Sequence, residues 1–420
     1  MSKLENYCKL NYRLPAQTLR WELSRGTLPD IELVEDAVPQ PRDDEVLFRV
    51  DTNAICFSDI KVLKNPTSHP RMKGYDLAKG KLVPGHETTI TIVKAGAKVA
   101  RHFKPPARFL LQADIARTGE AVGYNIWGGM LQFGVWGPNV QEYLIPIPDG
   151  VGYSQASLVE PWACVEASYR RVDVGSKDRA VLLLGGGGPM GQMHLERCIG
   201  LKRSGRCPGL QTVMVTDISK DRLATVTKRY EKRAAAQGIR LVCADVTGRT
   251  LDDVLREAGI GGFDYIVALA AIEKVVLEAK RRLKEYGALN LFAGFPRGAG
   301  ALNMGDLHYD QHTVTGNSGS EMEDMERVLR LTQKGEVDTD YSVGAVAGFR
   351  AGKEALLDVA AAKSNNKIVI YNQLADLPLT PVEELSKLVK FSRRVAANVA
   401  EGIWSGAAEA EMLEQLLKLG

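Results

Sequence analysis

The pattern of hydrophobic and polar positions divides the 420-residue chain into three stretches. In the first stretch, residues 1 to 160, short β-branched segments are separated by Gly, Pro and Asp, which is typical of half-buried strands. The clearest expected strands are Glu45–Asp51, Thr88–Ala95 and Val140–Ile147. The connections at residues 64–84 and 105–138 are long, and such loops in a compact domain are usually functional or make subunit contacts. This stretch predicts a β-rich domain with enlarged loops.

In the second stretch, residues 161 to 320, apolar segments alternate with helical ones. Ala180–Gly186 is a continuous apolar run, as expected for a strand buried on both faces. Further strands are expected at Thr212–Asp217, Ile239–Asp245, Phe263–Ala271 and Gly287–Phe295. Helical segments such as Lys220–Gln237 lie between them. The alternation predicts a doubly wound parallel sheet and an α/β fold class.

The third stretch, residues 321 to 420, has a mixed pattern. We expect a helix at Glu321–Lys334, a strand at Asn366–Asn372 and a mostly helical tail at Thr380–Gly420. The change of pattern marks this stretch as a separate segment.

Composition removes several classes of protein from consideration. Lys and Arg number 54 against 51 Asp and Glu, so the net charge of +3 gives no reason to expect a nucleic-acid or membrane partner. No apolar run approaches the roughly 20 residues that cross a bilayer, and the N-terminus has no apolar signal segment. Six Cys are too few for a disulfide scaffold. We therefore expect a cytoplasmic protein with reduced thiols.

A glycine-rich motif lies between the first apolar strand and the following helix. The run Gly186-Gly187-Gly188-Pro189-Met190-Gly191 matches GxGxxG in the strand–helix context that a dinucleotide site requires. We expect Gly186 to permit the tight turn, Gly188 to let the backbone approach a pyrophosphate, and Gly191 to let the helix pack on the strand. The free N–H groups at the helix N-terminus would then face the phosphates. The alternative is a structural turn that binds nothing.

The choice of cofactor depends on the end of the next strand. Asp217 ends it, and a carboxylate there typically binds the ribose hydroxyls and favours NAD(H). Asp217 lies 26 residues after Gly191, which is a long spacing that an insertion at KRSGRCPGLQ would explain. Lys220 and Arg222 follow closely and could accept a 2′-phosphate, or they could be solvated residues of a helix start. NAD(H) is favoured, and NADP(H) stays possible.

Three short segments carry ligands suited to a metal. They are Ile55-Cys56-Phe57-Ser58-Asp59, Pro84-Gly85-His86-Glu87 and Leu158-Val159-Glu160-Pro161. A lone Cys is more often a small core residue, and a lone His more often a satisfied polar group. Together, ahead of a dinucleotide fold, the three segments fit a catalytic zinc site, which uses Cys, His and carboxylate ligands and keeps one position open.

These motifs resemble the zinc-dependent medium-chain dehydrogenase/reductase family, which carries Cys-x-Ser/Thr-Asp, Gly-His-Glu and a third ligand shortly before the nucleotide motif. The resemblance covers nearly the whole chain. It implies a GroES-like catalytic domain at residues 1–160, a Rossmann domain at 161–320 and a C-terminal return to the catalytic domain at 321–420. It also implies a homodimer or homotetramer.

The resemblance assigns roles to residues of the metal segments. It implies that Cys56, His86 and Glu160 bind zinc, because the Glu160-Pro161 form is similar to the sorbitol dehydrogenase branch. Glu87 would be an alternating ligand or lie just outside the ligand shell. No Cys lies between Cys56 and Cys164, so we predict one catalytic zinc and no structural zinc.

Three residues that follow Cys56 are expected to support the reaction. Ser58 would carry the proton to or from the substrate oxygen, and Asp59 would orient His86. Lys61 stands where the family often has a His for proton relay. It could serve in that relay, bind a substrate phosphate or be a solvated side chain.

A narrower resemblance lies in the second half of the chain. The segments VTDISKDRL, NLFAG, HYDQHTVTGNSGS, LPLTP and GIWSGAAEAEMLEQLL are similar to the L-sorbose 1-phosphate reductase branch. This resemblance implies an oxidoreductase that reduces a sugar-phosphate ketone, L-sorbose 1-phosphate, to D-glucitol 6-phosphate. The alternatives are a general polyol or alcohol dehydrogenase acting on unphosphorylated substrates, a zinc-free quinone reductase-like enzyme and a non-catalytic nucleotide-binding module.

Overall fold

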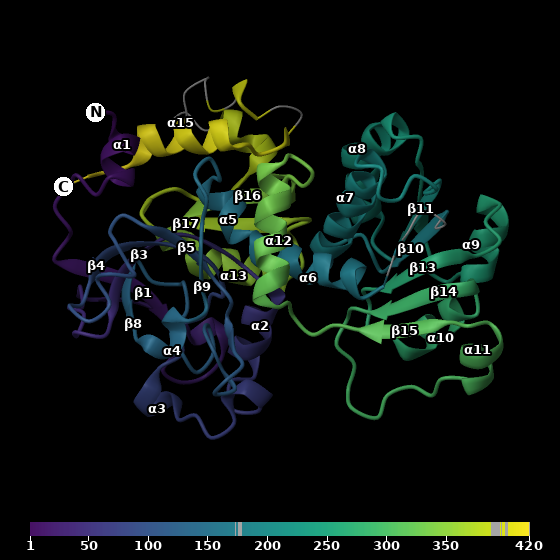
Figure 1. The fold of residues 1–420 in the computed structure, drawn as a ribbon, viewed down its shortest axis with the longest axis horizontal. Coiled ribbons are helices and arrows are strands. Elements are labelled where there is room, and N and C mark those ends of the chain that lie inside the picture. Colours follow the sequence, from purple (N-terminus) through teal and green to yellow (C-terminus); the bar gives the residue numbers. More distant parts are fainter. Residues whose placement is uncertain (173, 175–178, 388–394, 396, 400–401, 420) are drawn as a thin grey trace. The chain divides into compact units, whose positions relative to one another are not determined.

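The structure, a computed structural model, describes residues 1–172, 174, 179–387, 395, 397–399 and 402–419. The chain folds into two units. Unit 1 comprises Met1–Glu160 and Asp338–Gly420, and unit 2 comprises Pro161–Val337. Figure 1 shows the C-terminal helix α15 (Gly406–Leu416), in yellow, beside the N-terminal helix α1 (Lys3–Cys8). The chain therefore leaves unit 1 once and returns to it once.

Unit 2 contains a six-stranded parallel sheet with the order β12-β11-β10-β13-β14-β15. Successive strands add outward from β10, first on one side and then on the other, so the sheet is doubly wound and the predicted parallel α/β fold is confirmed. The strands are β10 (Ala180–Leu184), β11 (Thr212–Asp217), β12 (Arg240–Asp245), β13 (Phe263–Ala268), β14 (Leu283–Leu291) and β15 (Thr313–Gly316). Every residue of β10 is buried, which explains its unbroken apolar sequence.

Helices connect these strands. Those assigned to unit 2 are α6 (Val159–Arg171, whose first two residues belong to unit 1), α7 (Pro189–Arg203), α8 (Lys220–Ala236), α9 (Leu251–Ala258), α10 (Glu273–Lys280), α11 (Met304–Tyr309) and α12 (Met322–Gln333). Helix α12 was expected to open the C-terminal segment at residue 321, but it lies in unit 2, and unit 1 resumes only at Asp338. Its Asp324 accepts a 2.7 Å hydrogen bond from Arg170 of α6, which helps to hold it there.

Unit 1 is built on an eight-stranded mixed sheet with the order β18-β16-β17-β3-β4-β5-β9, and β8 pairs with β3. The strands are β3 (Val46–Ala54), β4 (Glu87–Ala95), β5 (Arg108–Leu111), β8 (Phe133–Trp136), β9 (Leu144–Pro146), β16 (Val343–Gly348), β17 (Lys367–Tyr371) and β18 (Thr380–Pro381). Two hairpins, β1 (Gln17–Glu22) with β2 (Glu32–Ala37) and β6 (Asp114–Ile115) with β7 (Glu120–Ala121), complete its strands among the described residues.

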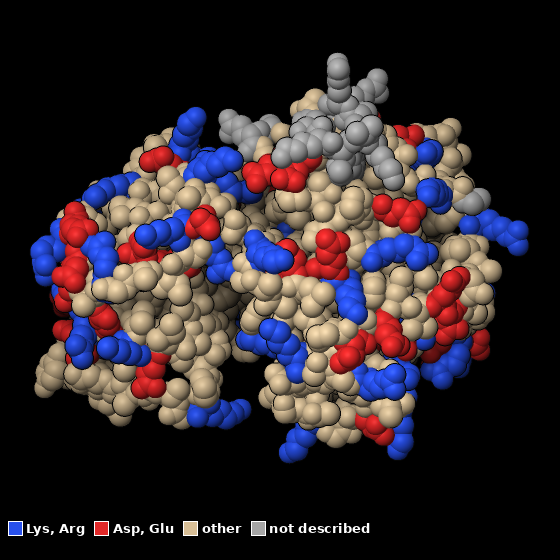
Figure 2. All heavy atoms as spheres, turned by 180° about the vertical axis from the view of Figure 1, so that it is seen from behind, with Lys and Arg blue, Asp and Glu red and all other residues tan. Residues whose placement is uncertain are grey.

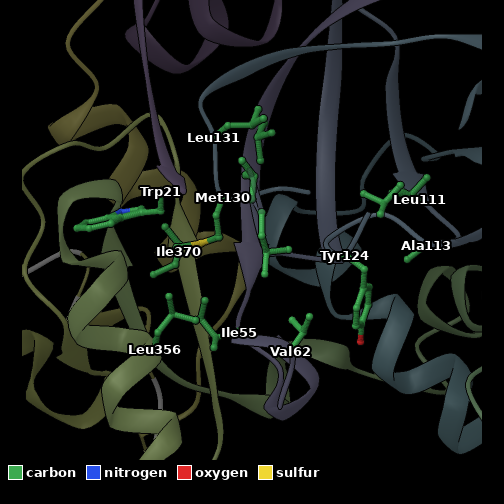
Figure 3. Close-up of a cluster of buried hydrophobic side chains, with 14 of the residues drawn as sticks. Trp21, Ile55, Val62, Leu111, Ala113, Tyr124, Met130, Leu131, Leu356 and Ile370 are labelled. Carbon is green, nitrogen blue, oxygen red and sulfur yellow. The ribbon is translucent and has the colours of Figure 1, made fainter. Parts of the chain in front are cut away.

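The remaining helices of unit 1 are short. Besides α1 and α15 they are α2 (Phe57–Lys64), α3 (Leu77–Gly80), α4 (Pro138–Gln141), α5 (Tyr153–Ser157) and α13 (Gly352–Ala360), with 3-10 turns at Leu28–Asp30, Pro70–Met72, Thr339–Ser342, Phe349–Ala351 and Val382–Lys387. Figure 3 shows part of the core, where Trp21, Ile55, Met130, Leu356 and Ile370 from distant segments pack together. This core includes side chains of β3 and β4, and the segments that carry the candidate metal ligands adjoin the end of β3 and the start of β4.

Three local expectations were wrong or incomplete. The strand expected at Val140–Ile147 divides into the end of α4 and a three-residue β9. Strand β16 was not expected, because its Gly- and Ala-rich sequence has weak strand propensity and it forms by pairing with β17 and β18. The tail expected to be mostly helical at Thr380–Gly420 contains β18, a 3-10 turn and α15, and residues 388–394, 396, 400–401 and 420 lie outside the described residues.

The surface agrees with the near-balanced charge. Figure 2 shows Lys and Arg side chains interspersed with Asp and Glu side chains over the face in view. In the part of the chain that the structure describes, no helix has the length and apolar character needed to cross a membrane.

Candidate functional site

Three of the expected metal ligands meet in unit 1. Cys56 occupies the N-cap position of α2, His86 directly precedes β4, and Glu87 is the first residue of β4. Strands β3 and β4 are antiparallel and pair Ala54 with Glu87, which brings the two ligand segments together. One ligand atom from each of Cys56, His86 and Glu87 lies within 4.8 Å of the other two. A thiol, an imidazole and a carboxylate are the ligand types of catalytic zinc.

Asp59 connects two of these residues. Its Oδ1 lies 2.9 Å from Nδ1 of His86 and accepts a 3.1 Å hydrogen bond from the Gly85 N–H, while Oδ2 accepts a 2.9 Å bond from the Cys56 N–H. Burial by itself would raise the pKa of Asp59, but the His86 ring and the backbone donors lower it below its ordinary value. An ionised Asp59 keeps the proton of neutral His86 on Nδ1 and leaves Nε2 free to bind a metal.

The turn before His86 requires glycine. Gly85 has a positive φ of +104°, and a Cβ there would lie 2.9 Å from the Met130 backbone nitrogen and 2.5 Å from Oδ1 of Asn53. A side chain would therefore displace His86 from its neighbours.

Glu87 is fully buried, and its two oxygens have different surroundings. Oε1 forms an ion pair with Nζ of Lys367, a buried residue at the start of β17. Oε2 has no hydrogen-bond partner among the described residues. Buried carboxylate oxygens normally have partners, so an unpartnered oxygen beside a thiol and an imidazole fits a bound cation. The residues present therefore fit zinc.

Lys367 was missed by the sequence analysis. A lysine at the head of the apolar run Ile368-Val369-Ile370-Tyr371 was the available signal, because a charged residue in a buried strand needs a partner. Burial would lower its pKa, but the neighbouring Cys56, Glu87 and Glu160 hold the pKa of Lys367 above its usual range.

Glu160 lies outside the three-residue cluster although it was expected as a ligand. It is in the first turn of α6. Burial raises the pKa of its carboxyl to about 7; His86 lowers that pKa and Glu87 raises it further. These influences place Glu160 near the cluster, and its role as a ligand remains a prediction.

Ser58 and Lys61 follow Cys56 on helix α2. Ser58 is half-buried, and its hydroxyl makes no hydrogen bond within the described part of the chain. Lys61 is exposed, with Nζ 5.7 Å from the centre of the Phe57 ring. Both are positioned on the helix that Cys56 caps, and their proposed proton and phosphate roles remain predictions.

The glycine motif in unit 2 forms the loop between β10 and α7. Pro189 and Met190 are the first two residues of α7. A Cβ on Gly191 would collide with the Gly186 carbonyl oxygen, so only glycine allows this approach of helix and loop. The left-handed residue of the turn is Gly185, with φ +73°, and a Cβ on Gly186 would lie 2.8 Å from Cβ of Leu183. A Cβ on Gly188 would meet nothing nearer than the Arg222 guanidinium at 3.9 Å, so this side of the loop is open.

Asp217 joins the glycine loop to the start of α8. Its Oδ2 accepts a 2.9 Å hydrogen bond from the Gly187 N–H, and its Oδ1 accepts bonds from the Ile218 and Ser219 N–H groups at 2.8 and 3.0 Å. Arg222 lies beside the loop, whereas Lys220 lies 3.8 Å from Asp245 in a weak ion pair. Of the two cations considered, only Arg222 is positioned against the glycines.

Two exposed isoleucines at the carboxyl edge of this sheet were also missed. Ile218 follows β11 and is 72% exposed, and Ile272 follows β13 and is 55% exposed. Apolar side chains exposed beside a candidate dinucleotide loop are suited to contact a flat base. The signal in the sequence was an isoleucine directly after the strand-ending Asp217.

Comparison with known proteins identifies relatives of this chain among dehydrogenases and reductases. No family model matches the chain. L-sorbose 1-phosphate reductase of Klebsiella pneumoniae is 30% identical over 406 residues, covering 91% of this chain and 95% of that protein. Mannitol-1-phosphate 5-dehydrogenase of Aliivibrio fischeri is 28% identical, covering 92% and 95%. The solved structure of a zinc-binding dehydrogenase of Sinorhizobium meliloti bound to NADP has a TM-score of 0.66 at 18% identity, covering 85% and 100%.

The structural likeness confirms the GroES-like plus Rossmann architecture. The 30% identity to the reductase, which extends over nearly the full length of both chains, confirms the resemblance found in the sequence. The chain belongs to the zinc-dependent medium-chain dehydrogenase/reductase family of alcohol and sorbitol dehydrogenase-like oxidoreductases.

Proposed function

We propose that the protein is a zinc- and NAD(H)-dependent enzyme that reduces L-sorbose 1-phosphate to D-glucitol 6-phosphate. The Cys56–His86–Glu87 cluster, in which a buried Glu87 oxygen has no partner among the described residues, carries the proposal. The proposed substrate is inferred from the likeness of the chain to the Klebsiella reductase. A second sugar-phosphate relative, the Aliivibrio dehydrogenase, supports a phosphorylated substrate.

The residues of unit 1 would have the following roles in the reaction. Cys56, His86 and Glu87, with Glu160 nearby, would hold a zinc ion, which when bound supplies Lewis-acid activation of the substrate oxygen. Asp59 orients His86 through the 2.9 Å contact at Nδ1. In the reductive direction the Ser58 hydroxyl would deliver the proton that the substrate oxygen gains.

The glycine loop of unit 2 would bind the dinucleotide that supplies the hydride. Its backbone and the N-terminus of α7 would face the pyrophosphate. Oδ2 of Asp217 accepts a single hydrogen bond in the described structure, so it keeps an acceptor site for a ribose hydroxyl. The same carboxylate would repel a 2′-phosphate, which favours NAD(H), although Arg222 lies close enough to the loop to weaken this preference.

The surface of unit 2 bears on the expected homodimer or homotetramer. Strand β15 is at the edge of its sheet, and Tyr286, Met304 and Tyr309 near it are 66%, 79% and 79% exposed. A strand with one open edge beside exposed apolar side chains is suited to contact a second chain. Light scattering of the purified protein would test this expectation, and a monomer at micromolar concentration would contradict it.

A substrate panel combined with metal analysis tests the function. The purified enzyme would be assayed with NADH and NADPH on L-sorbose 1-phosphate and L-sorbose. The reverse reaction would be assayed with NAD⁺ and NADP⁺ on D-glucitol 6-phosphate and sorbitol. We expect one zinc per chain and the highest kcat/KM with the phosphorylated pair and NADH. Higher kcat/KM on sorbitol would indicate a general polyol dehydrogenase. Cofactor binding without turnover would indicate a nucleotide-binding module, and full activity without metal would indicate a zinc-free reductase.

A further inference from the structure

Basic side chains surround Tyr124, a buried residue next to the candidate zinc site. The Tyr124 ring centre lies 6.1 Å from that of His86. The Arg71 guanidinium carbon lies 5.0 Å from the Tyr124 ring centre, and the His69 ring centre lies 5.2 Å from it. Figure 3 shows the Tyr124 hydroxyl pointing away from its core neighbours Leu111 and Ala113. Tyr124 therefore lies close both to the metal ligand His86 and to the basic residues Arg71 and His69.

Arg71 is held in place but keeps donors available. Its Nη1 and Nη2 donate to the two carboxylate oxygens of Asp114, at 2.9 Å for Nη2. A guanidinium has five N–H groups, so this fork leaves three for another acceptor. About one third of the Arg71 side chain is exposed, so a ligand can reach it.

His69 and Lys61 are further basic residues near Arg71, His69 by a direct contact and Lys61 by its electrostatic effect on His69. The Nδ1 atom of His69 accepts a 3.3 Å hydrogen bond from the Arg71 backbone N–H, which leaves the proton of a neutral ring on Nε2. Within the described ranges Nε2 of His69 makes no hydrogen bond and Lys61 makes no ion pair. Burial, then Arg71, then Lys61 lower the pKa of His69 below its ordinary value, so the three groups lie close enough to act on one another.

The spacing suits one kind of substrate. In a ketose whose phosphate is on the carbon next to the carbonyl, four bonds of about 1.2 to 1.6 Å join the carbonyl oxygen to phosphorus, a reach of at most about 6 Å. A phosphate oxygen and a hydrogen bond of about 2.9 Å extend this reach further. The separations of 6.1 Å from His86 to Tyr124 and 5.0 Å from Tyr124 to Arg71 set an upper limit on the distance from His86 to Arg71, and the combined reach of the substrate is comparable with that limit.

We infer that Arg71, with His69 and Lys61, forms the binding subsite for the substrate's phosphate group. The inference rests on the proposed function and deepens it, because it assigns recognition of the ester to residues beside Tyr124 that are not among the metal ligands. Asp114 acts as a positioning residue that aligns the Arg71 fork. A planar guanidinium binds two oxygens of a phosphate at once, which a lysine cannot do.

The test compares Arg71→Gln with a matched control, Arg20→Gln. Arg20 also pairs with carboxylates, Glu22 and Asp36, and its guanidinium carbon also lies 5.0 Å from an aromatic ring, that of Trp127. For each protein, kcat/KM is measured on L-sorbose 1-phosphate and on L-sorbose, and the inhibition constant of inorganic phosphate is determined.

In Arg71→Gln we expect the ratio of kcat/KM between the phosphorylated and free ketose to fall about ten- to a hundredfold, the loss typical of a charge-assisted contact. Inhibition by inorganic phosphate should weaken in parallel, and Arg71→Lys should recover part of the ratio. Arg20→Gln should keep the ratio. If Arg71→Gln is poorly folded because Asp114 is left unpaired, the Arg71→Gln/Asp114→Asn variant removes both charges and serves in its place.

The outcomes separate this inference from the proposed function. If the wild-type enzyme prefers L-sorbose, both are wrong. If it prefers L-sorbose 1-phosphate and the ratio survives in Arg71→Gln, or both substrates lose activity equally, only the subsite is wrong. If Arg71→Gln lowers kcat/KM on a sugar acid such as L-galactonate more than on the phosphate ester, the subsite binds a carboxylate. That result would overturn its assignment as a phosphate site.

Discussion

Replacing Lys367 by Met tests the account of the buried charges at the candidate zinc site. Lys367 is 5% exposed and its partner Glu87 is 0% exposed. Met keeps the long unbranched stem and removes only the charge. In the zinc-free variant, Glu87 is left as a buried carboxylate that has lost its Oε1 partner and whose Oε2 already has none among the described residues.

The expected loss of folding stability follows from this burial. Removing one partner of a buried ion pair typically costs about 3 to 5 kcal/mol, because the remaining charge stays away from water. Unfolding free energies of whole domains are about 5 to 15 kcal/mol, so unit 1 should lose a large fraction of its stability. The double variant Lys367→Met/Glu87→Gln has no isolated charge and should recover most of the loss, which a double-mutant cycle measures as the coupling free energy of the pair.

Urea unfolding of the zinc-free proteins, followed by tryptophan fluorescence, measures these differences. Four of the five Trp residues lie in unit 1 (Trp21, Trp127, Trp136 and Trp404), so the signal reports mainly on the unit that carries the pair. The control is Lys280→Met in unit 2, where the partner Asp306 is 32% exposed and can be solvated by water. A Lys367→Met variant within 1 kcal/mol of wild type, or a double variant less stable than the single one, would refute the reasoning.

Three further predictions concern metal, cofactor and pH. Cys56→Ala should lose zinc and activity while unit 2, which has its own core, still binds dinucleotide; elemental analysis and cofactor titration check this, and full turnover by the metal-free variant would contradict it. Asp217→Ala should raise kcat/KM with NADPH relative to NADH, because the carboxylate that would repel a 2′-phosphate is gone; a wild type that already prefers NADPH would exclude this role. Burial, then Glu409, raise the pKa of Asp340 well above its ordinary value, so the folded state retains a proton that the unfolded state releases. The contribution of Asp340 to the free energy of unfolding therefore falls as pH rises above about 4, by up to about 1.4 kcal/mol per pH unit. The Asp340→Asn variant can still accept the 2.7 Å hydrogen bond from Ser154. In urea unfolding, its stability relative to wild type should therefore increase as pH rises. A difference between the two proteins that does not change with pH would show that Asp340 is not the responsible group.

The signals that the sequence carried were local. A strand buried on both faces must be apolar along its whole length, so Ala180–Gly186 was recognisable without any knowledge of its partners. Gly191 and Gly85 are needed because a Cβ has no room there, and both needs arise within short motifs. The ligand types Cys56, His86 and Glu87 were visible for the same reason, since each metal segment has its own residue pattern.

Contacts between distant segments were decided only by the tertiary structure. Lys367 meets Glu87 across 280 positions of sequence, and no spacing rule connects a lysine in one strand to a carboxylate in another. The choice between Glu87 and Glu160 as the residue nearest Cys56 and His86 depended on the pairing of β3 with β4. Burial then made that choice energetically important, because a charge removed from water needs a partner.

The extent of each unit was likewise a tertiary property. Strand β16 has a sequence of Val, Gly and Ala that favours no regular element, and hydrogen bonds to β17 and β18 make it a strand. Helix α12 was recognisable as a helix, but its place in unit 2 follows from ion pairs such as Arg170–Asp324. Periodicity reports which face of an element is buried, whereas the partner that buries it is chosen by the whole fold.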